Sequence, residues 1–339
     1  MPLPIGRRLL LGTAAAAPLL RPAISRAEDK NITILIWGTT WQLVMKQIAA
    51  NFTAATGIGV TLTTQTTSGE SLVKLQAMKA DPTVDVWFTT SSVAERAVKD
   101  GDLFADLPIT QLTNWKDVTP DARQPRWVGA YGYPLGIVWR PDMVKQPITS
   151  WEDLWSDKFV NQIGAPAPSS YQARMLLIAT ILAGGNIDNV DPGFAKLKAW
   201  RKNVAFWYTS DAQARKALAQ GEISVLIAPP AGAKTVRDQG TAVDMISPKP
   251  AAVLFDVMTM VKTKKQDLSA QFINFVINPQ SQGLIGELME NQPVNVLAPI
   301  PERVKAELPK PGDTVAFDEN VVNARFDGWS DRFKQMITD

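Results

Sequence analysis

The hydrophobic pattern near the start of the chain is that of a strand, a helix and a second strand. Apolar residues alternate with their neighbours over residues 32–36, which is the two-residue period of a half-buried strand. Val44, Ile48 and Phe52 then recur at a spacing that places them on one face of an amphipathic helix. A short β-branched run at residues 58–62 follows. The pattern predicts a strand–helix–strand unit.

The same alternation of short apolar runs and amphipathic stretches continues along the chain. Parallel strands joined by crossover helices predict an α/β fold in which mostly parallel sheets are flanked by helices. Further strands are predicted at residues 85–88, 131–142 and 254–261. Further helices are predicted at residues 69–80, 91–101, 170–185 and 194–203, with two more at residues 268–289 that are divided at Pro279 and one around Trp329 and Phe333.

Two proline-containing segments predict how the chain divides into domains. They are the Tyr133-Pro134 entry to a new strand and the return at residues 248–253. We expect residues 28–133 and 254–339, the latter with the C-terminal helices, to form a first lobe. Residues 134–253 then form a second lobe inserted into it.

The first 27 residues have the features of an export signal. Arg7-Arg8 is followed by the apolar run of residues 9–20, and Ser25-Arg26-Ala27 is a small-x-small cleavage site. The paired arginines indicate twin-arginine export, and an ordinary Sec signal is the alternative. The apolar run is too short to span a bilayer. We expect a periplasmic protein whose signal is cleaved near Ala27.

Composition excludes several classes of function. The chain has no cysteine, which excludes disulfides, thiolate metal sites and a lipid-modified N-terminal cysteine, and it has no histidine, which excludes a Ser-His-Asp triad. No phosphate-binding or dinucleotide-binding glycine motif occurs. Removal of residues 1–27 takes away four arginines, so 31 basic residues face 33 acidic ones and the net charge becomes −2. No basic tract remains for nucleic acid. We therefore expect no enzyme activity, no cofactor and no metal.

Carboxylates leave one alternative of another class open. Asp85, Asp153, Asp211 or Asp256 could supply an acid–base pair, as in a carboxylate-dependent secreted hydrolase. Sequence spacing does not show whether any two of them face each other. Caps and surface charges are the ordinary roles of such residues.

The order of motifs resembles that of the extracellular solute-binding proteins of ABC importers, in particular the cluster of spermidine/putrescine-binding and ferric-binding proteins. The resemblance covers nearly all of residues 28–339. It rests on ILIWG, FTAATGIGV, SLVKLQA, DVWF, YGYPLGIVW, TSWEDLW, ALAQGEISVLI and AQFINFVINPQSQ, in that order. It implies two α/β lobes on two hinge strands with the ligand between them, a type II periplasmic-binding-protein fold. The partners it implies are a small-molecule ligand and an inner-membrane permease, and we expect a monomer.

The turn after the first strand is an expected part of that ligand site. Ligands of open α/β sheets bind beyond the carboxyl ends of the strands, where Trp37-Gly38-Thr39-Thr40-Trp41 lies. The hydroxyl-rich loop at Thr89-Thr90-Ser91 lies at a second strand end. Tryptophans offer flat apolar walls, and hydroxyls offer hydrogen bonds. We expect Trp37 to form a wall and Thr39 or Thr40 to donate a hydrogen bond to the ligand.

The remaining site residues come from the resemblance alone. A tryptophan of polyamine-binding members falls on Pro229 and a second aromatic residue on Phe255. The acidic residue of those members falls on Val257, so Asp256, one step away, faces the cleft only if the strand register shifts. The complete expected set is Trp37, Thr39, Thr40, Trp41, Thr89, Thr90, Ser91, Tyr133, Ser169, Ser170, Tyr171, Pro229, Phe255 and Asp256.

The chemistry of the ligand stays open between two classes. A polyamine-like amine is the family default, although the segment where polyamine binders place acids has none here. An anion such as a phosphonate or organic acid would suit hydroxyl-rich turns at helix N-termini. Two or more unpaired carboxylates lining the cleft would favour the amine, and none would favour the anion. Iron is not favoured as the ligand. The ferric-binding proteins that the chain resembles use an adjacent pair of tyrosines, and the four tyrosines of this chain include no adjacent pair.

Overall fold

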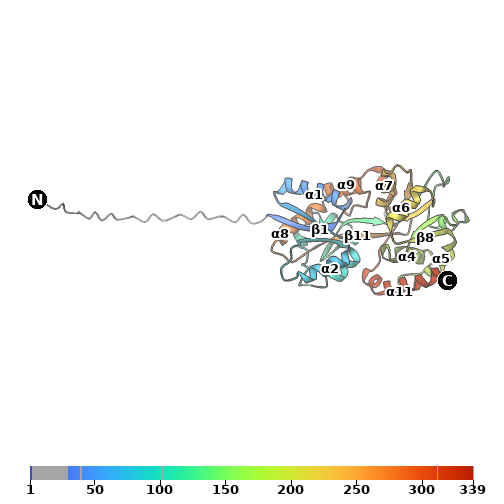
Figure 1. Cartoon of the computed structure of the whole chain (residues 1–339), viewed down its shortest axis with the longest axis horizontal. Helices are drawn as coiled ribbons and strands as arrows, with labels where there is room; N and C mark the ends of the chain where they lie inside the picture. The colour runs from blue at the N-terminus through green and yellow to red at the C-terminus, as the bar shows by residue number, and fades with distance from the viewer. Residues whose placement is uncertain (2–29, 39, 101, 311, 339) are drawn as a thin grey trace. The chain divides into compact units, whose positions relative to one another are not determined.

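Two β-sheets organise the chain in the computed structural model, which describes Met1 and residues 30–338 except residues 39, 101 and 311 (Figure 1). The predicted signal segment therefore lies outside the described residues from residue 2 onward. The mixed α/β fold with helices around both sheets confirms the predicted fold class.

The first sheet has seven strands in the described part of the chain, and its main order is β2-β1-β3-β11-β5-β4, with β12 paired to β11. β1 runs parallel to β2 and β3, whereas β11 runs antiparallel to β3 and β5. The bounds are β1 Asn31–Trp37, β2 Gly59–Gln65, β3 Val86–Thr90, β4 Arg123–Gln124, β5 Trp127–Pro134, β11 Ala251–Met260 and β12 Thr314–Val315.

The second sheet has the order β10-β6-β9-β7-β8 among the described residues. β7 runs parallel to β8 and β9, whereas β6 runs antiparallel to β9 and β10. The bounds are β6 Gly136–Trp139, β7 Ile163–Pro166, β8 Val204–Tyr208, β9 Val225–Ala228 and β10 Asp244–Ile246. The chain thus passes from one sheet to the other after β5 and returns after β10.

Helices cover both sheets. Their bounds are α1 Thr40–Thr56, α2 Ser68–Ala77, α3 Ser91–Ala97, α4 Arg174–Leu182, α5 Asp191–Trp200, α6 Asp211–Gln220, α7 Pro230–Asp238, α8 Gln266–Val276, α9 Pro279–Met289, α10 Glu302–Glu307 and α11 Glu319–Thr338. In Figure 1 the orange helices α8 and α9 lie near the blue α1, although more than 200 residues separate them in sequence.

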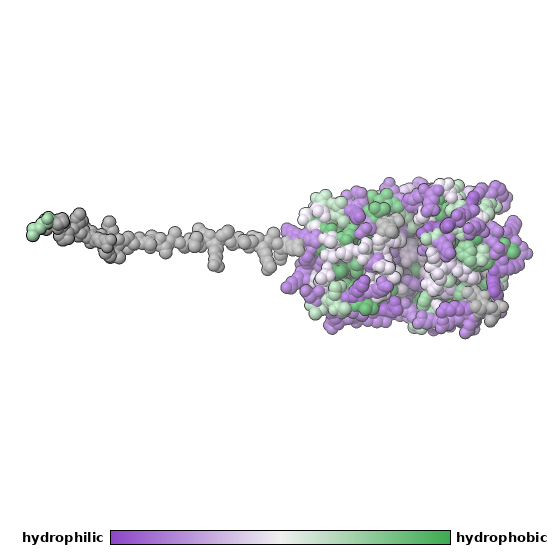
Figure 2. Space-filling view, in the orientation of Figure 1, coloured by the Kyte–Doolittle hydropathy of each residue, from purple (hydrophilic) through white to green (hydrophobic). Residues whose placement is uncertain are grey.

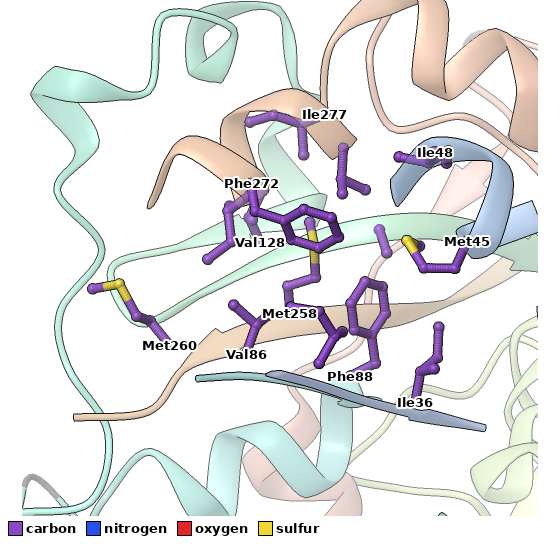
Figure 3. Packing of buried hydrophobic residues seen from close by; sticks show 14 of the residues in the cluster. Ile36, Met45, Ile48, Val86, Phe88, Val128, Met258, Met260, Phe272 and Ile277 are labelled. Atoms are coloured by element: carbon purple, nitrogen blue, oxygen red, sulfur yellow. The ribbon is translucent and has the colours of Figure 1, made fainter. Parts of the chain in front are cut away.

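The first sheet packs on α1 and α8 through the residues that the sequence pattern selects. Val44, Ile48 and Phe52 of α1 are buried in one cluster with β1 and with Phe272 of α8. Met258 of β11 lies in the same cluster, and Figure 3 shows Ile48, Met258 and Phe272 directed into the same interior. The periodicity of residues 32–62 therefore gave the strand, the helix and its buried face correctly.

The second sheet has its own core, to which the last helix contributes. Val322, Trp329 and Phe333 of α11 are buried with residues of α4 and α5. Phe333 meets Trp207 of β8 edge to face, with ring centroids 4.8 Å apart. The end of the chain therefore packs on the second sheet, which its amphipathic pattern alone does not indicate.

The helix predicted at residues 170–185 is shorter than expected. α4 begins only at Arg174, because Tyr171, Gln172 and Ala173 have positive φ angles of 51°, 52° and 57°. Consecutive residues in the left-handed region cannot continue a right-handed helix, and each costs roughly 1–2 kcal/mol when it is not glycine. The left-handed turn at residues 171–173 therefore holds Tyr171 away from the helix axis.

Surface composition is mixed on the face drawn in Figure 2. Hydrophilic residues are interspersed with separate apolar spots over both sheets' helices. Such spots are normal, since apolar atoms contribute more than half of a folded protein's surface. Among the described helices, none combines the length and apolarity required to cross a membrane.

Candidate functional site

A cavity of about 690 Å³ lies between elements of the first sheet and elements of the second. One side is formed by β1, α1, β3, β5, β11 and the end of α9, and the other by residue 171, α6 and α7. This volume lies within the range of pockets that hold small molecules. We call it the central cavity.

Two tryptophans form an aromatic wall of the central cavity. Trp37 ends β1 and Trp41 lies in the first turn of α1, so the strand–helix turn brings them together with ring centroids 6.5 Å apart. Trp41 also stacks on Tyr131 of β5, with centroids 5.0 Å apart and planes tilted by 2°. Both tryptophans line the cavity. The indole faces carry negative electrostatic potential, which suits a cation or an apolar chain.

Asp256 of β11 lies at the base of the same cavity. The pairing of β11 with β5 shifts register between Asp256 and Val257, which is the condition under which the sequence expects Asp256 to face the cleft. The hydroxyl of Tyr131 donates to one carboxylate oxygen, and that of Tyr133 donates to the other across 3.3 Å. Asp256 is only 5% exposed, and this burial raises its pKa to about 7 despite the two hydroxyl bonds, which lower it.

The tyrosines beside Asp256 stay protonated. Burial raises the pKa of Tyr131 and of Tyr133 well above the usual value of 10, and the neighbouring carboxylate adds to the effect. Both therefore act as hydrogen-bond donors at neutral pH.

The opposite wall is built around the left-handed turn. The Tyr171 hydroxyl donates to Oδ1 of Asp211, the first residue of α6, across 2.7 Å. Pro229 precedes α7 and lines the cavity beside them. Asp211 is exposed, so its carboxylate is accessible to a ligand in the cavity.

Two basic residues on this wall differ in their partners. Lys234 forms an ion pair with Asp238 across 2.6 Å, one turn apart on α7. Arg215 of α6 is half-buried and forms neither a hydrogen bond nor an ion pair with any residue that the structure describes. The pattern of buried and exposed residues along α6 is that of an ordinary surface helix, so sequence periodicity does not indicate that Arg215 lines a cavity.

Asn291 is a further lining residue that the sequence does not reveal. It is 0% exposed, and neither its Oδ1 nor its Nδ2 has a partner among the described residues. The neighbouring Gln292 exchanges two backbone hydrogen bonds with Gly132 of β5, at 2.7 and 2.8 Å, which fixes the backbone beside Asn291. The pairing of Gln292 with Gly132 joins residues far apart in sequence, so no local motif could have indicated that Asn291 lines the cavity.

The structure brings together half of the residues expected from the sequence. Those that line the central cavity are Trp37, Trp41, Thr90, Tyr133, Tyr171, Pro229 and Asp256. Thr39 lies outside the described residues, and Thr40 is placed only as the first residue of α1.

The other five expected residues do not line this cavity. Strand alternation turns Phe255 away from it, and Phe255 lines a second cavity of about 380 Å³ together with Ser91. Thr89 is fully buried, one step from the cavity-facing Thr90. Ser170 donates to the carbonyl oxygen of Tyr208 across 3.3 Å, and its neighbour Ser169 lies outside the cavity lining. A contact between any of these five residues and a ligand therefore stays a prediction from the sequence, and these residues lie outside the lining of the central cavity.

No group of three or more metal-ligating side chains with a suitable arrangement occurs among residues 30–338 as described. The carboxylates of the central cavity are separated between its two sides, so the arrangement suits an organic solute with polar ends.

Comparison with known proteins identifies the class. The sequence matches the family of bacterial extracellular solute-binding proteins over residues 47–306, and the chain belongs to this family. No curated protein matches the chain.

Solved structures with the same fold include proteins of ABC transporters. An ABC transporter protein from Clostridium perfringens ATCC 13124 is 24% identical with a TM-score of 0.76, over 90% of this chain and 99% of that one. The spermidine/putrescine substrate-binding protein PotD from Streptococcus pneumoniae strain Canada MDR_19A is 19% identical with a TM-score of 0.77, over 91% and 99%. The periplasmic binding protein AttC from Agrobacterium tumefaciens C58, in an open unliganded conformation, is 21% identical with a TM-score of 0.75, over 91% and 99%.

The predicted family and role are thereby confirmed. The chain is a solute-binding protein of an ABC transporter, and its family and structural neighbours serve transport and are not enzymes. Membership implies a small-molecule ligand, an ABC permease as partner and a location outside the cytoplasm.

Proposed function

We propose that this chain captures a small organic solute that carries an ammonium group and delivers it to an inner-membrane permease. The observation that carries this proposal is the state of the cavity carboxylates. In the described part of the chain, Asp256 and Asp211 accept hydrogen bonds from tyrosine hydroxyls and have no cationic partner. Two or more cavity carboxylates without a cationic partner favour an amine ligand over an anion, and Asp256 and Asp211 meet this condition.

The walls of the cavity support the same ligand class. An ammonium beside Asp256 would form charge-assisted hydrogen bonds in a site with little water, where such bonds are strong. Trp37 and Trp41 line the cavity, where their indole rings would contact the methylene groups and the positive charge. A polyamine-like amine is the family default within this class.

We also propose that two lobes close on the solute. The strands of residues 136–246 belong to the second sheet, and those before and after them belong to the first, which supports a second lobe at residues 134–253. Leu43 of α1 and Leu288 of α9 border the cavity and are 67% and 40% exposed. Closure would remove this apolar surface from water and so favour the closed form.

Export and assembly complete the proposal. We propose that residues 1–27 act as a cleaved signal and that the protein carries no lipid anchor, a proposal that the lack of cysteine in the sequence supports. We propose that the protein works as a periplasmic monomer, without nucleic acid.

A binding screen tests the ligand class. Purified protein is titrated with putrescine, spermidine and other amines, and with dicarboxylates and phosphonates of matched length, by thermal shift and calorimetry. We expect stabilisation by at least one compound with an ammonium group. Binding confined to compounds without any ammonium group would contradict the proposal.

A further inference from the structure

An unpaired cation lines the same central cavity as the unpaired carboxylates. Arg215 lines the cavity from α6, and its guanidinium has five N–H donors but no hydrogen-bond or ion-pair partner in the described residues. Asp211 lies one turn earlier on the same helix, where an ion pair could form, but its carboxylate accepts from Tyr171. The nearby Lys234 differs, because Asp238 already neutralises it.

An unpaired amide lies on the first-sheet side of the same cavity. Asn291 is 0% exposed with both side-chain polar atoms unpartnered among the described residues. A buried amide without partners costs free energy, and the next residue, Gln292, is held by two backbone hydrogen bonds to Gly132. A solute in the cavity would supply the missing partners.

We propose that the solute is a zwitterion, with its ammonium at Asp256 and Asn291 and its carboxylate at Arg215. The proposal rests on the ammonium-binding function above and adds the second end group. Asp256 neutralises the ammonium, and Oδ1 of Asn291 accepts a hydrogen bond from an N–H group of the ammonium. The guanidinium of Arg215 matches a carboxylate in a two-bond geometry.

The same residues discriminate against the two symmetrical alternatives. A diamine long enough to cross the cavity would bring its second ammonium to the wall that carries both Asp211 and Arg215, and it would leave the guanidinium of Arg215 without a partner of opposite charge and beside a like charge. A dicarboxylate would bring a carboxylate to Asp256 and would require Asp256 to be protonated. A solute with one end of each charge gives a partner of opposite charge to both Asp256 and Arg215.

Three series of probes of matched length test the proposal. They are α,ω-diamines, ω-amino acids and α,ω-dicarboxylates with about three to six carbons, titrated by calorimetry near pH 8. We expect one ω-amino acid to bind more tightly than the diamine and the dicarboxylate of the same length, by about tenfold or more because each loses a charge-assisted contact.

Arg215→Gln identifies the residue responsible, and Lys216→Gln is the matched control. Lys216 is the next residue on α6, is exposed and does not line the cavity. We expect Arg215→Gln to lower the affinity for the ω-amino acid by about tenfold or more. The ratio of its affinity to that of the diamine should fall as well. Lys216→Gln, which removes the same charge from the same helix, should bind as the parent protein does.

The outcomes separate this proposal from the one it rests on. Diamines that bind best, with affinity unaffected by Arg215→Gln, would overturn the zwitterion and leave the ammonium-binding function intact. Binding of the dicarboxylates alone would overturn both the zwitterion proposal and the ammonium-binding function. Failure of all three series to bind at millimolar concentration would also overturn the zwitterion.

Discussion

Replacing Asp256 by asparagine separates the charge of the site from its shape. The substitution keeps the size of the side chain and an oxygen that can accept from Tyr131 or Tyr133. It removes the negative charge that we assign to the ligand's ammonium. A hydrogen bond to a charged group contributes about 1.5–3 kcal/mol, so affinity for an ammonium ligand should fall between about tenfold and about a hundredfold.

The same substitution should not destabilise the fold at neutral pH. Burial raises the pKa of Asp256 from the model-peptide value of 3.8 to about 7, so the folded state binds more protons than the unfolded state between these values. The stability of the parent protein therefore falls as pH rises through this window, by at most about 4 kcal/mol. Asp256→Asn removes this loss, so the variant should melt at the same or a higher temperature near pH 8.

Calorimetric titration together with thermal melts reads out both effects. Asp85→Asn is the matched control, because Asp85 is also buried but accepts from the Thr33 N–H at 2.8 Å and the Thr263 hydroxyl at 2.6 Å, away from the cavity. That variant should lose roughly 1–3 kcal/mol of stability and keep its affinity per folded molecule. An Asp256→Asn protein that binds amines as tightly as the parent would refute the role of this carboxylate.

Three further substitutions test separate parts of the site. Trp37→Ala should weaken binding by about 1–3 kcal/mol, measured by titration; a variant that melts far lower yet binds normally per folded molecule would show that Trp37 is structural. Asn291→Leu should raise the melting temperature of the ligand-free protein by a few degrees, because it removes about 1–3 kcal/mol of unsatisfied burial, and should weaken binding. Lower stability together with unchanged binding would contradict the assigned role. Gln172→Gly should change the free energy of unfolding in urea by about 0–1 kcal/mol in the stabilising direction, because φ is 52° there. A clear loss of stability would show that the left-handed turn is not strained.

Local hydrophobic periodicity was sufficient to predict the strand–helix–strand unit of residues 32–62. The alternation at residues 32–36 and the spacing of Val44, Ile48 and Phe52 each gave the correct buried face, because these patterns depend only on backbone geometry. The pattern around Trp329 and Phe333 also gave a helix. It could not show that this helix packs on the second sheet, because the partner of an amphipathic face is a long-range choice.

The site was predictable where it follows the end of a strand. Trp37 and Thr90 lie at strand ends beside the central cavity, as the rule for α/β sheets predicts. Alignment could not fix which side of a strand faces the ligand, since a one-residue difference exchanges Phe255 for Asp256.

The two polar residues that define our further inference were beyond sequence reasoning. Arg215 has the exposure and spacing of an ordinary surface residue on α6. Asn291 lines the cavity beside Gln292, which pairs with Gly132 far away in sequence. Neither arrangement leaves a local signal in the chain.

The most direct test of the account is the number of protons released when an ammonium ligand binds. With a pKa of about 7, Asp256 is about three-quarters protonated near pH 6.5, and a cation beside it must bind to the ionised form. Calorimetry of the tightest amine from the screen, in buffers of different ionisation enthalpy, measures this release. The account predicts that about three-quarters of a proton leaves per ligand near pH 6.5, that almost none leaves near pH 8.5, and that Asp256→Asn abolishes the release. Binding without proton release near pH 6.5 would contradict the account, which requires a protonated Asp256 to ionise beside the ammonium.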